Sequence, residues 1–328
     1  MNTKMMMFTL MLFMSTIITM SSNNWIGMWM GMEINLMSFI PLMNNNQDKK
    51  TSQSMMIYFL TQSISSICML FAILMNKFMM YNSQEVISQM ILTISLMIKL
   101  GGAPFHMWLP EIMANLNWKN NMLLMTWQKM APMTILSNNI NYQMIYLFII
   151  MSASVGAIGA LNQTSLRKIM AYSSINHLSW MMMLMMMENT WILYLLLYSI
   201  IIIMMFSMLM KKNIMFINQM ISNKMTTLEK ITIASLMMSM GGLPPFTGFL
   251  PKWLVIQSMM DSNMWTMLTF MVFMSLITLF YYLRMVYPLI MNYSTKMKWM
   301  NSLINNKMTI LILSSNMMMP FMLLMPLP

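Results

Sequence analysis

The sequence is poor in cysteine and in charge, and each shortage excludes a class of protein. Cys68 is the single cysteine in 328 residues. A disulfide scaffold is therefore excluded, and the chain alone cannot supply the roughly four thiolates that an iron–sulfur cluster needs. Charged residues make up 8% of the chain, against about 25% in soluble domains. Because 59% of the residues are hydrophobic, disorder is excluded too. What remains is a polytopic membrane protein.

Eleven apolar stretches are long enough for a helix to cross the hydrocarbon core, which takes about 20 residues. We predict an all-α fold with crossings over residues 4–21, 25–43, 54–76, 84–114, 121–138, 142–161, 166–187, 190–210, 226–260, 264–287 and 308–325. Segments 84–114 and 226–260 are too long for one straight crossing. Both contain Gly and Pro midway, so we interpret each as one broken helix. The alternative is two short crossings in place of each.

Basic residues gather on one side of this arrangement. If successive loops alternate between two sides, the side of the N-terminus holds thirteen of them: Lys4, Lys49, Lys50, Lys119, Arg167, Lys168, Lys211, Lys212, Lys224, Lys230, Lys296, Lys298 and Lys307. The other side holds Lys77, Glu85, Glu188 and Asp261. This positive-inside asymmetry supports eleven crossings, N-terminus inside and C-terminus outside, because two crossings per broken helix would scatter the lysines. Topology thus explains most of the net charge of +11, and no basic run indicates nucleic-acid binding.

The two predicted breaks share a motif. Residues 99–106 read KLGGAPFH and residues 240–248 read MGGLPPFTG. Each break lies in the fourth helix of a five-helix set, one over residues 1–138 and the other over 142–288. Because five is odd, the sets have opposite orientations, so we predict one transmembrane domain over residues 1–328: an antiporter-like inverted repeat plus an extra helix at 308–325. Broken backbone must line a polar cavity, since hydrocarbon cannot satisfy it. The alternative is a pair of packing kinks.

Several ionisable residues fall inside the predicted helices, namely Glu33, Lys99, Lys129, Lys252, His106 and His177. A lysine at mid-bilayer costs roughly 2.5–3.5 kcal/mol on insertion scales, so such residues are functional by default. Glu33 is the only carboxylate in the central layer and is expected to pair with Lys99, beside the first break. Pro132 removes a helical hydrogen bond and opens a polar gap next to Lys129. Lys252 directly follows the second break.

Proton relay is the chemistry that fits these residues. A lysine in water holds its proton too firmly to relay it near neutral pH, while desolvation weakens that hold and a neighbouring carboxylate strengthens it. Moving a carboxylate charge or changing hydration would load and unload the lysine. The alternatives are structural ion pairs for Lys99 and Lys129, snorkelling for Lys252 and satisfied core histidines for His177 and His106.

Five ordered motifs resemble the subunit 2 family of mitochondrial NADH–ubiquinone oxidoreductase (respiratory complex I), in its animal and insect form. They are GMEIN at 31–35, GGAPFHMWLPE at 101–111, TWQKMAP at 126–132, AYSSINH at 171–177 and GGLPPFTGFLPKW at 241–253. The resemblance covers essentially the whole chain and implies an antiporter-like, proton-pumping subunit of the inner membrane. It also implies that Glu33 pairs with Lys99, that Lys129 is the central lysine and Lys252 the terminal one, and that His177 belongs to the polar axis between them.

The resemblance further implies partners and a location. The N-terminus and basic loops would face the mitochondrial matrix and the C-terminus the intermembrane space, with other membrane-arm subunits and phospholipids, including cardiolipin, as partners. The chain has no GxGxxG motif, so NADH, FMN, iron–sulfur clusters and ubiquinone are expected on other subunits, with no cofactor or metal here. The 61 methionines are expected to fill space as Leu and Ile do. Two alternatives are a stand-alone cation/proton antiporter and a non-catalytic membrane scaffold.

Overall fold

The computed structural model describes residues 3–44, 49–78, 82–139, 142–187, 190–222, 225–291 and 307–318. In these ranges the chain is helical, and its one β pairing is an isolated bridge between Ser165 and Phe216. Glu188, Lys224, Lys296, Lys298 and residues 319–325 of the predicted last segment lie outside the described residues. The predicted all-helical class is confirmed for the described part of the chain.

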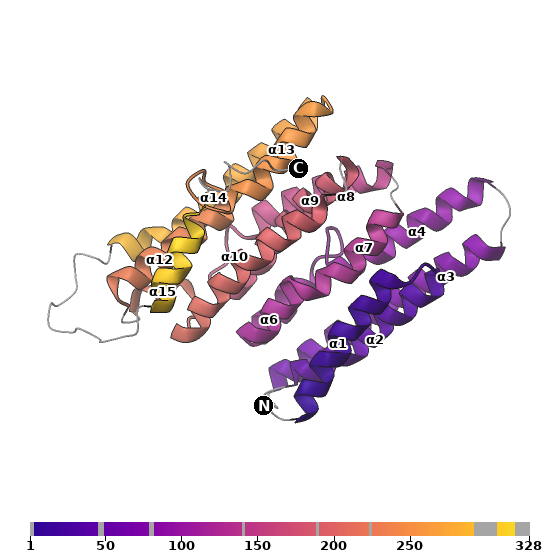
Figure 1. Cartoon of the computed structure of the whole chain (residues 1–328), viewed down its shortest axis with the longest axis horizontal. Coiled ribbons are helices and arrows are strands. Elements are labelled where there is room, and N and C mark those ends of the chain that lie inside the picture. Colours follow the sequence, from indigo (N-terminus) through magenta and orange to yellow (C-terminus); the bar gives the residue numbers. More distant parts are fainter. Residues whose placement is uncertain are drawn as a thin grey trace. The chain divides into compact units, whose positions relative to one another are not determined.

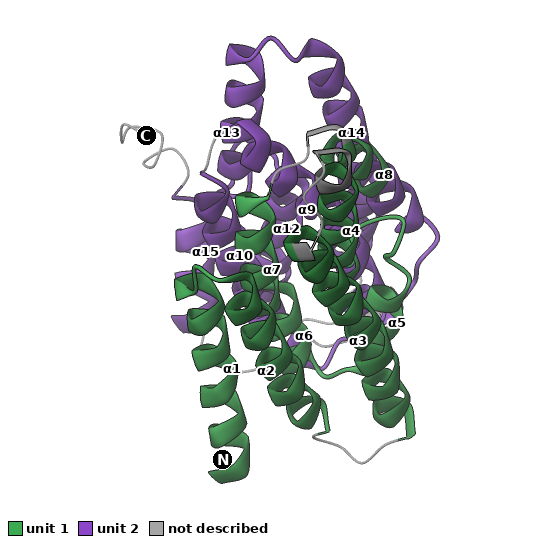
Figure 2. Ribbon diagram, turned by 90° about the vertical axis from the view of Figure 1, so that its right-hand side faces the viewer, with its two compact units in different colours: residues 1–152 green, residues 153–328 purple. Residues whose placement is uncertain are grey.

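The chain divides into two compact units, Met1–Ser152 and Ala153–Pro328 (Figure 2). Unit 1 contains α1 (Thr3–Ser21), α2 (Trp25–Met43), α3 (Lys49–Phe78), α4 (Asn82–Leu100), α5 (Trp108–Asn115), α6 (Trp118–Met125), the 3-10 turn η1 (Trp127–Lys129) and α7 (Met130–Asn138). Helix α8 (Tyr142–Gly159) runs across the boundary. Unit 2 continues with α9 (Leu166–Met187), α10 (Trp191–Lys212), α11 (Ile217–Ser222), α12 (Thr227–Gly241), α13 (Phe249–Asp261), α14 (Trp265–Met291) and α15 (Lys307–Asn316) (Figure 1).

The helices follow the predicted apolar segments closely, and both predicted breaks are present. Helix α4 ends at Leu100 and α5 begins at Trp108, while α12 ends at Gly241 and α13 begins at Phe249. Five of the described helices are long and apolar enough to cross a membrane by length and composition. The total of eleven crossings and the inverted repeat therefore stay predictions.

Segment 121–138 differs from the single helix predicted there. It is divided into α6, η1 and α7, with a 3-10 bond from the Met130 N–H to the Trp127 carbonyl. The reason is local, because Pro132 has no N–H with which to continue the α-helical pattern onto the carbonyl of Gln128. Short 3-10 stretches inside helices often mark functional hinges, and this one ends at Lys129.

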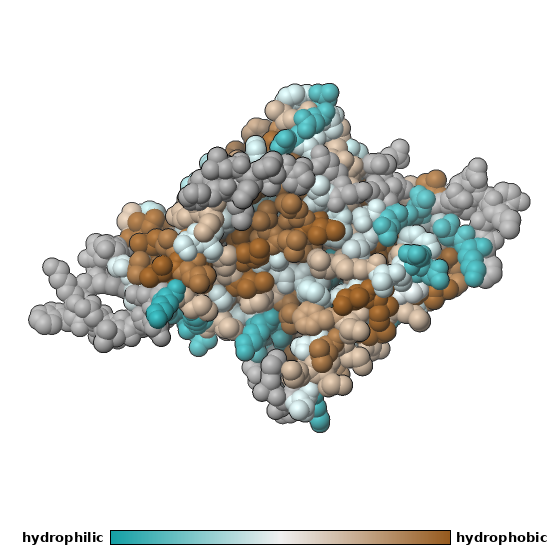
Figure 3. All heavy atoms as spheres, viewed as in Figure 1, coloured by the Kyte–Doolittle hydropathy of each residue, from teal (hydrophilic) through white to brown (hydrophobic). Residues whose placement is uncertain are grey.

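Each unit buries an apolar core and leaves large apolar side chains exposed. In unit 1, α1 packs on α2 and α3 on α4, and the Phe13 ring meets the Trp127 ring edge-on with centroids 4.5 Å apart. In unit 2, nearly every residue of α9 is buried, whereas Phe273 and Phe280 of α14 are 66% and 62% exposed. Hydrophobic residues cover broad areas of the surface (Figure 3). Such surfaces suit a lipid environment.

Gly248 allows the second break to fold tightly. A Cβ atom at this position would lie 1.8 Å from the Ser239 carbonyl oxygen, whereas one at Gly241 would meet nothing nearer than 3.7 Å. We expect Gly248→Ala to destabilise the fold by about 3 kcal/mol, since the obstacle is backbone, and Gly241→Ala to be tolerated. Thermal unfolding in detergent, followed by the loss of monodisperse protein, measures both variants. Equal midpoints for the two would contradict this packing.

Candidate functional site

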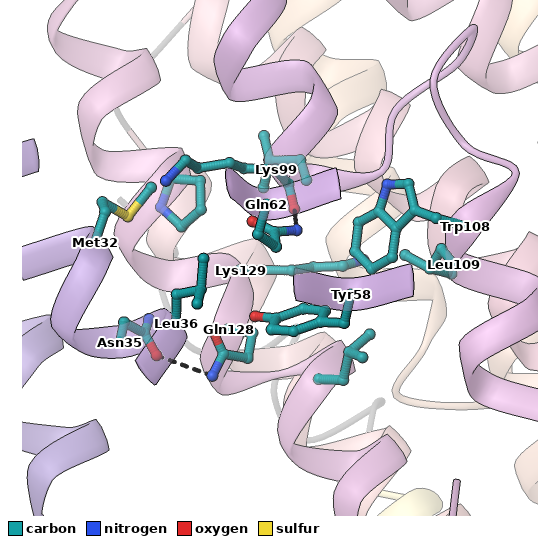
Figure 4. A pocket seen from close by; sticks show the side chains of 13 residues that line it. Met32, Asn35, Leu36, Tyr58, Gln62, Lys99, Trp108, Leu109, Gln128 and Lys129 are labelled. Carbon is teal, nitrogen blue, oxygen red and sulfur yellow. Dashed lines mark hydrogen bonds between the residues drawn. The ribbon is translucent and has the colours of Figure 1, made fainter. Parts of the chain in front are cut away.

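A small cavity lined by both polar and apolar side chains lies inside unit 1. Its volume is about 30 Å³, room for roughly two water molecules. The lining residues come from α2 to α7: Met32, Asn35, Leu36, Tyr58, Gln62, Lys99, Leu100, Trp108, Leu109, Leu124, Gln128, Lys129 and Pro132. Figure 4 shows Lys99, Lys129 and Gln62 around this space, with the Tyr58 ring beside them. Two of the predicted site lysines therefore share one cavity.

Lys129 enters the cavity from the break in segment 121–138. It is the last residue of η1, and its side chain is 3% exposed. The chain tightens into the 3-10 turn immediately before it, and Pro132, which also lines the cavity, follows in the first turn of α7. The structure thus places a polar space next to Lys129, where the sequence predicted one.

Lys99 reaches the same cavity from the first break. It belongs to the last turn of α4 and is 7% exposed. A helix C-terminus carries partial negative charge and favours a nearby cation. The backbone turns sharply after it, because the Gly101 and Gly102 N–H groups bond to the carbonyls of Ile98 and Met97 at 3.2 and 3.0 Å. This turn leaves the Lys99 side chain at a helix end.

Glu33 lies on α2 in the same unit as Lys99. The residue is half-buried, and its Oε1 is a buried atom that accepts no hydrogen bond from the described protein. Glu33 and Lys99 interact electrostatically, but no ion pair within 4.0 Å joins them. Among described residues, an ion pair of that kind is formed by Lys212 and Glu229, at 2.7 Å. Glu33 and Lys99 therefore attract each other across a gap.

Uncharged polar side chains complete the cavity, and sequence reasoning missed them. The Gln128 Nε2 donates to the Asn35 Oδ1 at 2.9 Å, and the Gln62 Nε2 donates to the Lys99 carbonyl at 3.4 Å (Figure 4). Asn35 and Gln62 are 3% and 5% exposed. The sequence signal for these residues was a side-chain amide inside an apolar run. A buried amide normally has a hydrogen-bond partner, so its presence indicates a polar contact there. These bonds join α2 to the Lys129 segment and α3 to the first break.

Lys252 occupies the second break, in unit 2. Its side chain is 4% exposed, and its Nζ donates to the Gly241 carbonyl at 2.7 Å. That carbonyl is at the C-terminal end of α12, where helix carbonyls lack partners and carry partial negative charge. Gly242 follows at φ +83°, and a Cβ there would lie 2.7 Å from the Lys252 Cδ. The broken helix thus accommodates a buried ammonium group, with the Trp180 ring 6.0 Å from Nζ. Lys252 does not snorkel.

His177 lies on the buried helix α9 of unit 2. It is 4% exposed, and its Nδ1 is 2.9 Å from the Tyr194 hydroxyl. The Tyr198 ring lies against it, with centroids 4.7 Å apart. Tyr194 was not predicted, since it comes from α10 and a tyrosine in an apolar run gives no signal. The imidazole therefore has a hydroxyl partner that can both donate and accept a proton.

His106 lies in the turn of the first break and is half-buried. Its Nδ1 is 3.1 Å from the Pro104 carbonyl, two residues away. It is not among the residues that line the cavity of unit 1. The structure therefore brings Lys99 and Lys129 together, places Glu33 in the same unit, and puts His177 and Lys252 in unit 2, with His106 in a local turn.

The chemistry available to these residues is acid–base. Lysine and histidine side chains can each bind and release a proton, and amide and hydroxyl groups can orient water between them. Among the described residues no group of three or more His, Cys, Asp or Glu side chains could hold a metal ion. Two buried lysines beside a cavity with amide and hydroxyl groups in its wall suit the transfer of protons.

The sequence matches a family model and known proteins over most of its length. Residues 22–278 match the family model described as NADH:quinone oxidoreductase/Mrp antiporter, transmembrane. The chain is 44% identical over 318 residues to NADH-ubiquinone oxidoreductase chain 2 of Anopheles gambiae, covering 94% of this chain and 93% of the relative. It is 40% identical over 314 residues to the protein of the same name from Locusta migratoria, covering 94% and 92%.

A solved structure shares the fold. It is respiratory complex I from Thermus thermophilus with bound aureothin, in which one chain superposes with a TM-score of 0.80 at 18% identity. The match covers 95% of this chain and 76% of the other.

Proposed function

Since the chain belongs to the NADH:quinone oxidoreductase/Mrp antiporter transmembrane family, we propose a specific route for protons through it. The chain is an antiporter-like, proton-translocating subunit of NADH:ubiquinone oxidoreductase, respiratory complex I. The route consists of Glu33, Lys99, Lys129, His177 and Lys252. Electron transfer from NADH to ubiquinone takes place on other subunits and drives the movement.

The observation that carries the route is the shared cavity of Lys99 and Lys129. Lys99 and Lys129 both line this cavity, so a proton could pass between them without crossing apolar protein. About two water molecules in the cavity would link them by hydrogen bonds. Glu33 then tunes Lys99 through charge, because it attracts the ammonium form without bonding to it directly. A change at Glu33 would alter the loading of Lys99.

In unit 2 the proposed groups have different partners. Lys252 donates to a backbone carbonyl, which holds the ammonium in place but cannot itself take up a proton at neutral pH. His177 has the Tyr194 hydroxyl, which can donate and accept. In unit 2, His177 is therefore better suited to pass a proton on, and Lys252 is better suited to hold one. His106 has a lesser role, because it bonds within its own turn.

The proposed setting is the mitochondrial inner membrane, which the chain crosses several times. The basic loops and the N-terminus face the matrix and the C-terminus the intermembrane space, in line with the positive-inside asymmetry. We also propose the inverted repeat of residues 1–138 and 142–288, with its broken helices at corresponding positions. Other membrane-arm subunits are the protein partners. Exposed apolar faces contact phospholipids, including cardiolipin.

Purification distinguishes this function from a stand-alone cation/proton antiporter. We expect the chain, extracted from membranes in mild detergent and captured by an affinity tag, to co-purify with flavin- and iron–sulfur-bearing chains. The flavin and iron–sulfur spectra of the eluate are the readout, and an untagged strain is the control. An eluate of the lone chain that exchanges cations for protons in liposomes would overturn the proposal.

A further inference from the structure

The C-terminal helix α15 ends against the loop of the second break. The Thr247 N–H donates to the Asn316 carbonyl at 3.1 Å, and the Thr247 Oγ1 donates to the Asn316 Oδ1 at 3.0 Å. Asn316 is fully buried and Thr247 is 8% exposed. The two residues are 69 positions apart in the chain. Two hydrogen bonds between the same residues fix both distance and orientation.

The nature of Asn316 suggests more than packing. Its carbonyl is at the C-terminal end of α15, where helix carbonyls lack partners within the helix, so the Thr247 N–H satisfies it. Its Nδ2 is buried and makes no hydrogen bond to the described protein. A buried donor without a partner is unfavourable, and an apolar side chain would serve a packing contact better. Retaining an amide here makes sense if its oxygen has a specific task.

The contact leads directly to Lys252. The Leu250 N–H donates to the Thr247 carbonyl at 3.3 Å, so Thr247 belongs to the turn that starts α13. Lys252 lies in the first turn of that helix, and its Nζ donates to the Gly241 carbonyl of α12. Helix α15 also packs on α12. The contact therefore sets the start of α13 relative to the helix end that Lys252 caps.

We infer that Asn316 is a positioning residue for Lys252, acting through Thr247. This inference rests on the proposed function, in which Lys252 carries a proton. Without the side-chain bond the first turn of α13 can shift, and the ammonium group loses its defined place on the Gly241 carbonyl. The C-terminal helix then has a role in proton transfer without contributing a proton-carrying group.

Proton pumping by the intact complex in liposomes tests the inference. We expect Asn316→Ala and Thr247→Val each to lower the pumping rate per assembled complex about threefold to tenfold, the value of one hydrogen bond. Thr247→Ser keeps the hydroxyl donor, so its pumping rate should stay within about twofold of the wild-type rate. The double variant Asn316→Ala, Thr247→Val should be no slower than the slower single variant, because both remove the same bond. Ser315→Ala is the matched control. Ser315 lies next to Asn316 but contacts Met204 and Ile312 instead of the break.

Lys252→Met separates failure of the inference from failure of the function. If Lys252→Met pumps normally, Lys252 carries no proton and the proposed function fails at this residue. If Lys252→Met stops pumping while Asn316→Ala and Thr247→Val pump at the wild-type rate, the inference alone is overturned. A loss of assembled complex in Thr247→Val with a normal rate per remaining complex also overturns it, because the contact would then be purely structural.

Discussion

Replacing Lys129 with methionine is expected to slow NADH:ubiquinone turnover about tenfold or more, because methionine cannot bind or release a proton. Side chains that transfer protons commonly contribute more than this to a reaction rate. Methionine keeps the length and apolar body of the side chain, so it fills the same space beside the cavity in unit 1 without a titratable group. Because the cavity is preserved, the complex should assemble in normal amounts. Turnover of purified complex with NADH and a soluble ubiquinone measures the effect.

Lys119→Met is the matched control for this prediction. Lys119 lies ten positions earlier in the same unit and is exposed, so its removal takes away a charge but no buried group. NADH oxidation by a water-soluble artificial acceptor should be unchanged in both variants, since the electron-accepting chains are intact. Wild-type turnover in Lys129→Met would assign Lys129 to structure alone and favour the scaffold hypothesis.

Replacing Lys252 with methionine is expected to have two effects. Turnover should again fall about tenfold or more. The thermal stability of the complex should fall as well, because the Gly241 carbonyl loses its donor at 2.7 Å and an unsatisfied buried group costs about 1–3 kcal/mol. Lys211→Met, at an exposed lysine of the same unit, should show neither effect. A variant that is destabilised but turns over normally would leave Lys252 as a helix cap only.

Much of the fold could be predicted because bilayer thickness and apolar run length constrain helices strongly. The bounds of α1, α2 and α9 agree with the predicted segments within about one residue. Both Gly-Gly-x-Pro motifs end a helix where the sequence indicated, since Gly permits the turn and Pro lacks the N–H that would continue the helix. The third break, at Lys129, was not predicted as a break. Pro132 was the signal, and it was interpreted only as a local gap.

The site was predictable only in its charged residues. A lysine inside an apolar run is conspicuous, so Lys99, Lys129 and Lys252 could be named from the sequence. Their uncharged partners could not, because Gln128 meets Asn35 across 93 positions and His177 meets Tyr194 on another helix. These contacts depend on helix packing, which a hydropathy pattern does not specify. Arg284 illustrates the same limit, because it donates to the carbonyls of Leu161 and Gln163, which lie 123 and 121 positions earlier in the chain.

Protons are proposed to cross the membrane through the buried lysines of this chain. Direct measurement of proton translocation in proteoliposomes tests this route, using complex that carries Lys129→Met and Lys252→Met together. The exposed pair Lys119→Met and Lys211→Met is the control. We expect the acidification rate per assembled complex to fall about tenfold or more in the buried pair. We also expect this rate to be no lower than in the slower single variant, because residues of one relay act as a unit. Acidification at the control rate by a fully assembled buried-pair complex would rule out proton transfer through these two lysines.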